Sequence, residues 1–163
     1  MEELQLEIFL LFWLIAVNGA PILLTKLLGK RFSYPVDCNQ LFFDGRPILG
    51  ASKTFRGLVS ALLMSVLIGS IFAMPLLTSL LFGALSMAGD MTSSFIKRRL
   101  GLVSSSMALG LDQIPESLFP LLGCKGLLGI GTGQIFSIVL AFFCAELILS
   151  RILFWLKVRE TPY

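Results

Sequence analysis

Two charged stretches interrupt a sequence that is otherwise almost continuously apolar. The first covers 44–57 (DGRPILGASKTFRG) and the second covers 89–113 (GDMTSSFIKRRLGLVSSSMALGLDQ). Charged side chains are rare inside membranes, because each one costs about 2.5–3.5 kcal/mol at the centre of a spanning helix on insertion scales. Carboxylates, hydroxyls, glycines and basic residues in the same two stretches are typical of a site that binds phosphate groups.

In the second stretch, four polar side chains share one face of an expected helix. Their spacing of i, i+3, i+4 and i+7 places on that face Asp90, Ser93, Ser94 and Lys97, with Arg98 and Arg99 beside it. A solvated helix end accounts for the basic residues, but not for a carboxylate that ends an uncharged run. We expect Asp90 and Lys97 to be catalytic, and Ser94 and Arg98 to bind substrate.

A second isolated carboxylate, Asp112, allows two interpretations. One is a helix N-cap, because Pro115 follows three residues later. The other is a metal site shared with Asp90, because Mg²⁺ is usually bound by one or two carboxylates together with phosphate oxygens and water. We expect Asp90 and Asp112 to hold Mg²⁺, Asp112 to be catalytic and Gln113 to bind substrate. Glu116 either assists them or offsets the basic residues.

The first stretch combines basic side chains and hydroxyls with three glycines. Glycine lets the backbone approach phosphate closely, and the basic and hydroxyl groups donate hydrogen bonds to it. We expect substrate binding by Asp44, Arg46, Ser52, Lys53, Thr54 and Arg56. The spacing is not that of a Walker A motif, and no strand leads into it. A basic loop that contacts anionic lipid is the alternative.

The composition indicates an all-α integral membrane protein with a single membrane-embedded domain over 1–163. Hydrophobic residues make up 56% of the chain and charged residues 14%, whereas a soluble domain is roughly 25% charged. The chain has no histidine, which excludes histidine-based acid–base catalysis, histidine metal sites and Ser-His triads. The three cysteines lack CxxC spacing and are more typical of small buried side chains.

The apolar runs predict about five transmembrane helices. These are 8–25, 57–73, 75–88, a short or partly re-entrant segment from about 112 through 114–122, and 126–155. The uncharged run 57–89 is divided at Pro75, because about 50 Å of helix is too long for one crossing of a roughly 30 Å core. We interpret Gly126–Gly133 as a connection or a close helix contact rather than a phosphate-binding turn, since no strand precedes it. Glu146 is expected to pair with a basic residue or to lie at the interface.

The basic residues predict the orientation of a multi-pass protein of the cell membrane. With five crossings and the N-terminus outside, every Lys and Arg except Lys125 falls on the cytosolic side. This arrangement puts Glu2 outside, and it puts the C-terminal tail with Arg159 in the cytoplasm. Both polar loops are then cytosolic, in contact with nucleotides and metal ions.

The ordered motifs resemble those of the CDP-archaeol synthases, membrane CTP transferases related to the CDP-diacylglycerol synthases. The resemblance rests on 44–57, Gly89-Asp90, 94–101 (SFIKRRLG) and 111–113 (LDQ), and it covers nearly the whole chain. It implies five helices, an external N-terminus and two cytosolic loops. The chain departs from the archaeal pattern at 51–52, 55 and 114–116, and it lacks the His-Gly-Gly signature of the larger diacylglycerol enzymes.

The resemblance implies a lipid-phosphate cytidylyltransferase. Such an enzyme transfers CMP from CTP to a membrane lipid phosphate, archaetidic acid-like or phosphatidic acid-like, and releases pyrophosphate. The expected partners are CTP, the lipid phosphate and the bilayer, with no nucleic acid and with a homodimer left open; the expected cofactor is Mg²⁺. The alternatives are a non-catalytic membrane transporter or lipid-binding scaffold, and a polyprenyl-phosphate enzyme.

Overall fold

A computed structural model describes residues 3–157, which form helices and no strand. The helices are α1 (Glu3–Leu28), α2 (Phe55–Ile71), α3 (Leu76–Arg99), α4 (Gln113–Gly123), α5 (Lys125–Leu128) and α6 (Thr132–Trp155). Two isolated β-bridges, Pro35 with Thr54 and Leu41 with Pro47, brace the long loop between α1 and α2. The expectation of an all-helical protein is confirmed.

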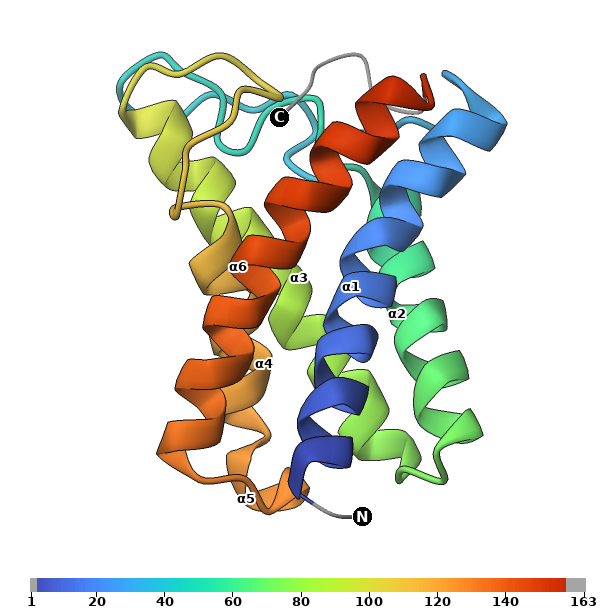
Figure 1. Ribbon diagram of the computed structural model, residues 1–163. Coiled ribbons are helices and arrows are strands. Elements are labelled where there is room, and N and C mark those ends of the chain that lie inside the picture. Colours follow the sequence, from blue (N-terminus) through green and yellow to red (C-terminus); the bar gives the residue numbers. More distant parts are fainter. Residues whose placement is uncertain (1–2, 158–163) are drawn as a thin grey trace.

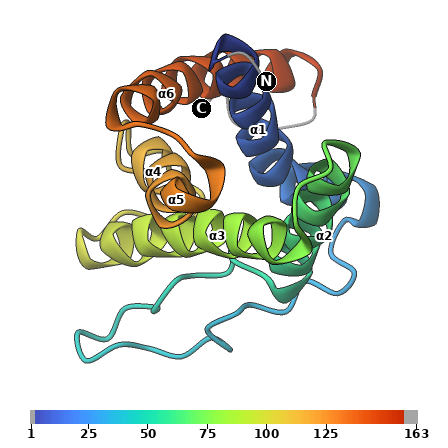
Figure 2. The ribbon, with the colours of Figure 1, turned by 90° about the horizontal axis from the view of Figure 1, so that it is seen from below.

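The longer helices contact one another in the order of a ring, α1 with α2, α2 with α3, α3 with α4, α4 with α6 and α6 with α1. Figure 2 shows this ring from below, and Figure 1 shows it from the side. The two polar loops are the loop between α1 and α2 and the loop between α3 and α4. Both lie at the end of the bundle where α3 and α6 finish, whereas α1 begins at the opposite end (Figure 1). The two charged stretches therefore lie at the same end of the bundle, which agrees with the prediction that both face one side of the membrane.

Aromatic stacking joins α1 to α3 in the core. The ring of Trp13 lies 4.2 Å from that of Phe82, almost parallel to it. Both side chains are fully buried. The indole N–H of Trp13 donates a hydrogen bond to the carbonyl oxygen of Ser65 on α2 at 3.1 Å. Because this polar group is satisfied, the indole is buried without leaving an unpaired donor.

The hairpin of α2 and α3 packs through small residues. A Cβ atom added at Gly83 would lie 2.7 Å from the Cβ of Ser65, so the two helices approach too closely for a larger side chain there. Contacts of this kind are typical of helices that associate in membranes. The break between the helices falls at Pro75, as expected.

The predicted crossing 75–88 and the predicted helical face from Asp90 to Lys97 belong to one continuous helix, because α3 runs to Arg99. One helix boundary differs clearly from the expectation. The last helix was expected to begin at Gly126. It begins at Thr132, because Gly129 adopts a left-handed conformation (φ 66°) that separates α5 from α6. The glycine-rich segment thus connects two helices at the end away from the polar loops (Figure 1).

Helix lengths bear on the membrane crossings. Two helices, α1 and α6, are long and apolar enough to cross a membrane, and α2 is a shorter apolar helix. The 11 residues of α4 rise about 16 Å, roughly half of a 30 Å hydrocarbon core. The fourth segment is therefore short, as the sequence indicated. The number of five crossings stays a prediction, and the sides assigned to Glu2 and Arg159 concern residues outside the described range.

Thiol labelling tests the orientation. In a background with Cys38, Cys124 and Cys144 replaced by serine, single cysteines are placed at Ser105 and Thr132, which are both exposed and lie at opposite ends of the bundle. We expect a membrane-impermeant thiol reagent to label Thr132→Cys in intact cells, and to label Ser105→Cys only after permeabilisation. The reverse pattern would place both polar loops outside the cell.

Candidate active site

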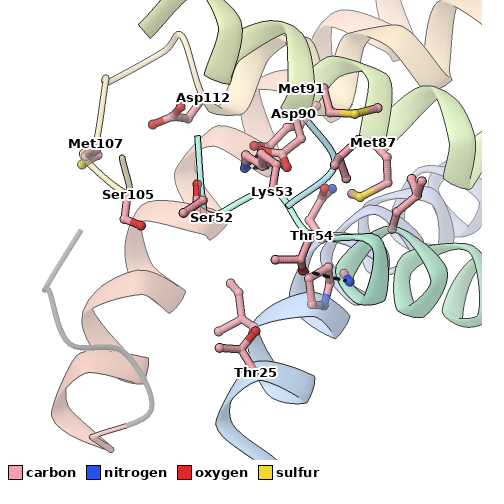
Figure 3. A pocket seen from close by; sticks show the side chains of 18 of the residues that line it. Thr25, Ser52, Lys53, Thr54, Met87, Asp90, Met91, Ser105, Met107 and Asp112 are labelled. Atoms are coloured by element: carbon pink, nitrogen blue, oxygen red, sulfur yellow. Dashed lines mark hydrogen bonds and ion pairs between the residues drawn. The ribbon is translucent and has the colours of Figure 1, made fainter. Parts of the chain in front are cut away.

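A cavity of about 700 Å³ lies beneath the two polar loops and reaches α1, α3, α4 and α6. This size falls in the range of small-ligand sites. Figure 3 shows side chains that line it, from the loop before α2, from α1, from α3 and from the segment before α4. The polar residues on its inner wall are Lys53, Asp90, Lys97, Asp112, Gln113 and Glu116.

One ion pair ties the first polar stretch to α3. The Nζ atom of Lys53 lies 2.5 Å and 2.6 Å from the two carboxylate oxygens of Asp90. Each of the two side chains is 20% exposed. Burial, the largest single effect, lowers the pKa of Lys53, but the negative charges of Asp90, Glu116 and Asp112 and the hydrogen bond to Asp90 together raise it by more, so that the net shift is upward. Lys53 therefore stays protonated at neutral pH and carries its positive charge into the cavity.

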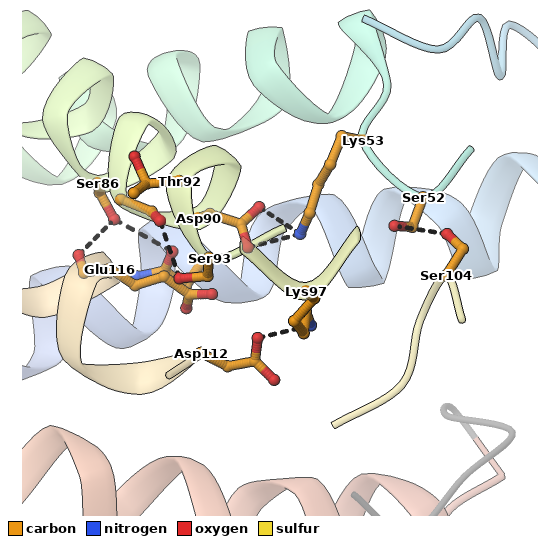
Figure 4. Close-up of polar contacts among 12 residues, drawn as sticks. Ser52, Lys53, Ser86, Asp90, Thr92, Ser93, Lys97, Ser104, Asp112 and Glu116 are labelled. Atoms are coloured by element: carbon orange, nitrogen blue, oxygen red, sulfur yellow. Dashed lines mark hydrogen bonds and ion pairs between the residues drawn. The ribbon is translucent and has the colours of Figure 1, made fainter. Parts of the chain in front are cut away.

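A second ion pair ties α3 to the segment before α4 (Figure 4). The Nζ atom of Lys97 lies 2.6 Å from Oδ1 of Asp112, and it also donates to the carbonyl oxygen of Ser106 at 2.9 Å. The other carboxylate oxygen of Asp112 accepts from the backbone N–H of Ala108 at 2.8 Å. Asp112 stands at the N-cap position of α4 but makes no capping hydrogen bond. The capping interpretation of Asp112 is therefore wrong.

Gly89 permits the close approach of α3 and α4 that brings a third carboxylate to the site. A Cβ atom at Gly89 would lie 2.1 Å from the carbonyl oxygen of Pro115, so only glycine fits. The next residue on α4, Glu116, is buried, and its carboxyl group lies within hydrogen-bonding reach of the Asp90 carboxyl. The hydroxyl of Ser86 fixes this turn by donating to the carbonyl oxygen of Glu116 at 3.1 Å.

Two residues of the first loop that were expected to bind substrate fasten that loop to the end of α3. Asp44 accepts a hydrogen bond from Arg99 at 2.8 Å, and Arg46 donates to the carbonyl oxygen of Arg99 at 2.7 Å. The guanidinium of Arg99 also lies over the ring of Phe42, 4.6 Å from its centroid. Neither Asp44 nor Arg46 lines the main cavity. Arg99, which was interpreted as a solvated basic residue, anchors the loop.

Two predicted residues of α3 also lie away from the main cavity. Ser94 is almost fully buried and is not among the residues that line it. Arg98 is also buried; its guanidinium donates to the carbonyl oxygen of Val103 at 2.7 Å. It lines a separate cavity of about 600 Å³ between the two loops. Asp90 and Lys97 therefore line the main cavity, whereas Ser94 and Arg98 do not.

The remaining predicted residues do line the cavity: Ser52, Thr54, Arg56 and Gln113. All four also form hydrogen bonds within the protein, and two of these bonds shape the start of a helix. The Oγ1 atom of Thr54 accepts from the backbone N–H of Gly57 at 3.2 Å and so caps α2 (Figure 3). The side-chain oxygen of Gln113 accepts from the backbone N–H of Gly110 at 2.8 Å, which shapes the turn before α4.

Sequence reasoning missed Asp37, which organises the first loop from outside the charged stretches. Its buried carboxylate accepts three backbone N–H groups, those of Asn39, Leu49 and Gly50, at 2.8–3.0 Å. Burial raises the pKa of Asp37, but these hydrogen bonds together lower it by more, so the pKa lies below the usual value of an aspartate. The only signal in the sequence is Asn39 two residues later, a spacing typical of an Asx turn.

The side chains of this cavity supply two of the oxygen ligands that a hard divalent cation needs, but not a complete set. Within residues 3–157, no group of three or more His, Cys, Asp or Glu side chains is arranged to hold a metal ion. Mg²⁺ bound to a nucleotide needs only one or two carboxylates, because phosphate oxygens and water complete its shell. Asp90 and Asp112 supply oxygen ligands of this class in one cavity. In this structure a lysine ammonium provides the compensating positive charge for each of them.

Comparison with known proteins matches this chain to one family model over nearly its full length. Residues 4–163 match the CarS-like family, described as CDP-archaeol synthase. The chain belongs to the CDP-archaeol synthase family. The resemblance noted from the ordered motifs is therefore confirmed.

Relatives within the CDP-archaeol synthase family cover most of the chain. The CDP-archaeol synthase of Sulfurisphaera tokodaii is 34% identical over 135 residues, which is 79% of this chain and 81% of the relative. That of Hyperthermus butylicus is 40% identical over 106 residues, covering 61% of this chain and 60% of the relative. A solved structure described as an intramembrane enzyme for archaeal membrane lipids biosynthesis matches with a TM-score of 0.71. It is 27% identical and covers 87% of this chain and 90% of its own.

The close helix contact at the site is testable in this CDP-archaeol synthase family member by substituting glycine. We expect Gly89→Ala to force α3 away from the backbone of Pro115, since overpacking of this kind costs about 1–3 kcal/mol. Thermal unfolding of the purified protein in detergent should show a lower Tm, and catalytic activity should fall with it. Gly19→Ala on α1 is the control, because no atom beyond its chain neighbours and the nearby backbone of α1 lies within 4 Å of the added methyl group. Equal effects of the two substitutions would contradict the assigned contact.

Proposed function

We propose that this protein transfers CMP from CTP to a membrane lipid phosphate, and releases pyrophosphate, in the cavity lined by Asp90 and Asp112. Membership of the CDP-archaeol synthase family supports this class of reaction. The observation that carries the proposal is the pairing of two carboxylates with two lysines in one cavity. A lipid-binding scaffold explains basic residues, but it does not explain carboxylates placed among them.

We assign the triphosphate of CTP to Lys53 and Lys97. Each lysine carries a positive charge into the cavity, where its ammonium group pairs with one carboxylate. A triphosphate carries several negative charges, and charge-assisted hydrogen bonds to phosphate are among the stronger polar contacts in proteins. In this proposal the two ammonium groups turn from the carboxylates to the phosphates and stabilise the charge that develops on the leaving pyrophosphate.

We assign Mg²⁺ to Asp90 and Asp112, whose oxygens become free when the lysines move to phosphate. When bound, Mg²⁺ neutralises phosphate oxygens and orients them for in-line displacement. Glu116 stands beside Asp90 as a third carboxylate, and in the proposal it holds Asp90 in place. The backbone contact at Gly89 fixes the distance between the two helices that carry these groups.

The chemistry needs positioning more than proton transfer. An oxygen of the acceptor lipid phosphate is already nucleophilic, and it forms a bond to the α-phosphorus of CTP while the bond to the bridging oxygen of pyrophosphate breaks. The absence of histidine from the chain is compatible with this reaction. Holding both substrates in line supplies a large part of the rate enhancement in such reactions. One chain supplies every residue named, so the proposal needs no second copy.

A transfer assay tests the proposal. Purified protein is incubated with labelled CTP, Mg²⁺ and a mixture of lipid phosphates, and the lipid-linked label and pyrophosphate are both measured. We expect wild type to form both products in equal amounts. Asp90→Asn and Asp112→Asn should each lower the rate on the order of 100-fold or more, because they remove transition-state charge stabilisation. Glu7→Gln is the matched control, since its carboxylate lies at the opposite end of the bundle.

The same assay separates the alternatives. A transporter or scaffold would form no product from CTP. A polyprenyl-phosphate enzyme would release phosphate or transfer its lipid without CTP. Full activity in both Asp90→Asn and Asp112→Asn would move the reaction out of this cavity even if CMP transfer occurs.

A further inference from the structure

The side of the main cavity away from Asp90 is built by α1 and α6. One face of α1 lines it, at positions spaced i, i+3, i+4, i+7 and i+8: Asn18, Pro21, Ile22, Thr25 and Lys26. From α6, Glu146, Leu147 and Ser150 line it. Figure 3 shows Thr25 on this side, with Lys53 and Asp90 across the cavity. The cavity therefore extends beyond the inner wall as far as α1 and α6.

One hydrogen bond connects α1 to α6 near their beginnings and another connects α1 to the residues just after α6; Lys26 and Lys157, which form the second, also line the cavity. Near their beginnings, the hydroxyl of Ser137 donates to the carboxylate of Glu7 at 3.0 Å. Near their ends, the Nζ atom of Lys26 donates to the carbonyl oxygen of Lys157 at 2.6 Å. Next to the cavity-lining positions, Leu23 on α1 and Ile148 on α6 are at least half exposed. The lining residues Ile22 and Leu147 are thus each followed in the chain by an exposed apolar side chain.

Two cations on this side have neutral partners. Arg56 donates to Thr25 Oγ1 at 3.3 Å and to the carbonyl oxygen of Arg31. Lys26 donates to a carbonyl oxygen. Within residues 3–157 neither of them forms an ion pair with a carboxylate, in contrast to Lys53 and Lys97 on the inner wall. Two positive charges without a described carboxylate partner, beside an apolar surface, suit an anion that carries hydrocarbon chains.

We propose that Lys26 and Arg56 form the subsite for the phosphate of the acceptor lipid, whose chains pass between Ile22 and Leu147 into the bilayer. This inference rests on the proposed function and adds which side of the cavity receives the lipid. The inner lysines are then left for the nucleotide, and the acceptor phosphate faces the α-phosphorus of CTP from the α1 side. The same two cations suit the phosphates of CTP or pyrophosphate, so the test must separate lipid from nucleotide.

Steady-state kinetics with both substrates varied makes this separation. Arg56→Gln and Lys26→Gln are compared with Arg151→Gln, an exposed basic residue of α6 that does not line the cavity. We expect the first two to raise the KM for lipid phosphate in mixed micelles about tenfold or more, equivalent to about 1.4 kcal/mol. The KM for CTP should change less than twofold. Arg56→Lys should recover most of the lipid affinity, and Arg151→Gln should match wild type.

A structural role alone would not give this pattern, because it would lower the amount of folded protein without changing one KM selectively. A rise in the KM for CTP with no change for the lipid would assign the cations to the nucleotide and overturn the inference. Unchanged KM values in Lys26→Gln would overturn it too, even if Arg56→Gln fails to fold, since the Lys26 side chain is exposed.

Direct binding distinguishes failure of this inference from failure of the proposed function. Binding of a fluorescent lipid phosphate is measured without CTP in wild type, Lys26→Gln and Arg151→Gln. Loss of binding in Lys26→Gln, with binding retained in wild type and in Arg151→Gln, supports the subsite even if wild type transfers no CMP. Equal binding in all three proteins, with CMP transfer by wild type, would leave the proposed function intact and reject the subsite.

Discussion

Compensation of buried charge is the constraint on which this structure depends. Asp90 and Asp112 lie in a protein that is 56% hydrophobic, and each is held by one lysine at 2.5–2.6 Å. These ion pairs are partly buried; removing one partner of a fully buried pair usually costs about 3–5 kcal/mol, because it leaves an uncompensated charge. The first polar stretch must therefore reach α3, and the segment after α3 must fold back over it. The cavity is the space that these two connections enclose.

Two further contacts make that arrangement specific. Gly89 brings the backbones of α3 and α4 together, which places Glu116 beside Asp90. At the end of α3, Arg99 holds Asp44 and the carbonyl oxygen of Pro47, and so fixes the outer part of the first loop. Residues near the charged face thus fall into two groups, those that line the cavity and those that hold the first loop in place above it.

The sequence was sufficient for the class of fold, for the position of the two charged stretches at one end of the bundle, and for the family. It was sufficient also for Asp90, Lys97 and Asp112 in one cavity, because helical spacing and isolated carboxylates are visible in a single chain. The sequence did not predict the contacts of these side chains with residues from distant loops. The pairing of Lys53 with Asp90 and the placement of Asp44 on Arg99 depend on loop conformation, which no periodicity encodes.

Other departures have equally local causes. The last helix starts late because Gly129 takes a left-handed conformation. The face of α1 that lines the cavity was missed because Asn18 and Pro21 also suit a kink in an apolar helix. Asp37 was missed because it precedes the charged stretches, and its partners are backbone groups.

The central claim is that the carboxylates of this cavity bind the metal–nucleotide complex. Crystals grown with CTP and Mn²⁺ in place of Mg²⁺ test it most directly, because the anomalous signal of manganese marks the metal alone. The account predicts a single strong peak in contact with Asp90 or Asp112, with the CTP phosphates between it and Lys53 or Lys97. A metal and triphosphate bound in the second cavity beside Arg98, with the lysine–carboxylate pairs intact, would contradict it.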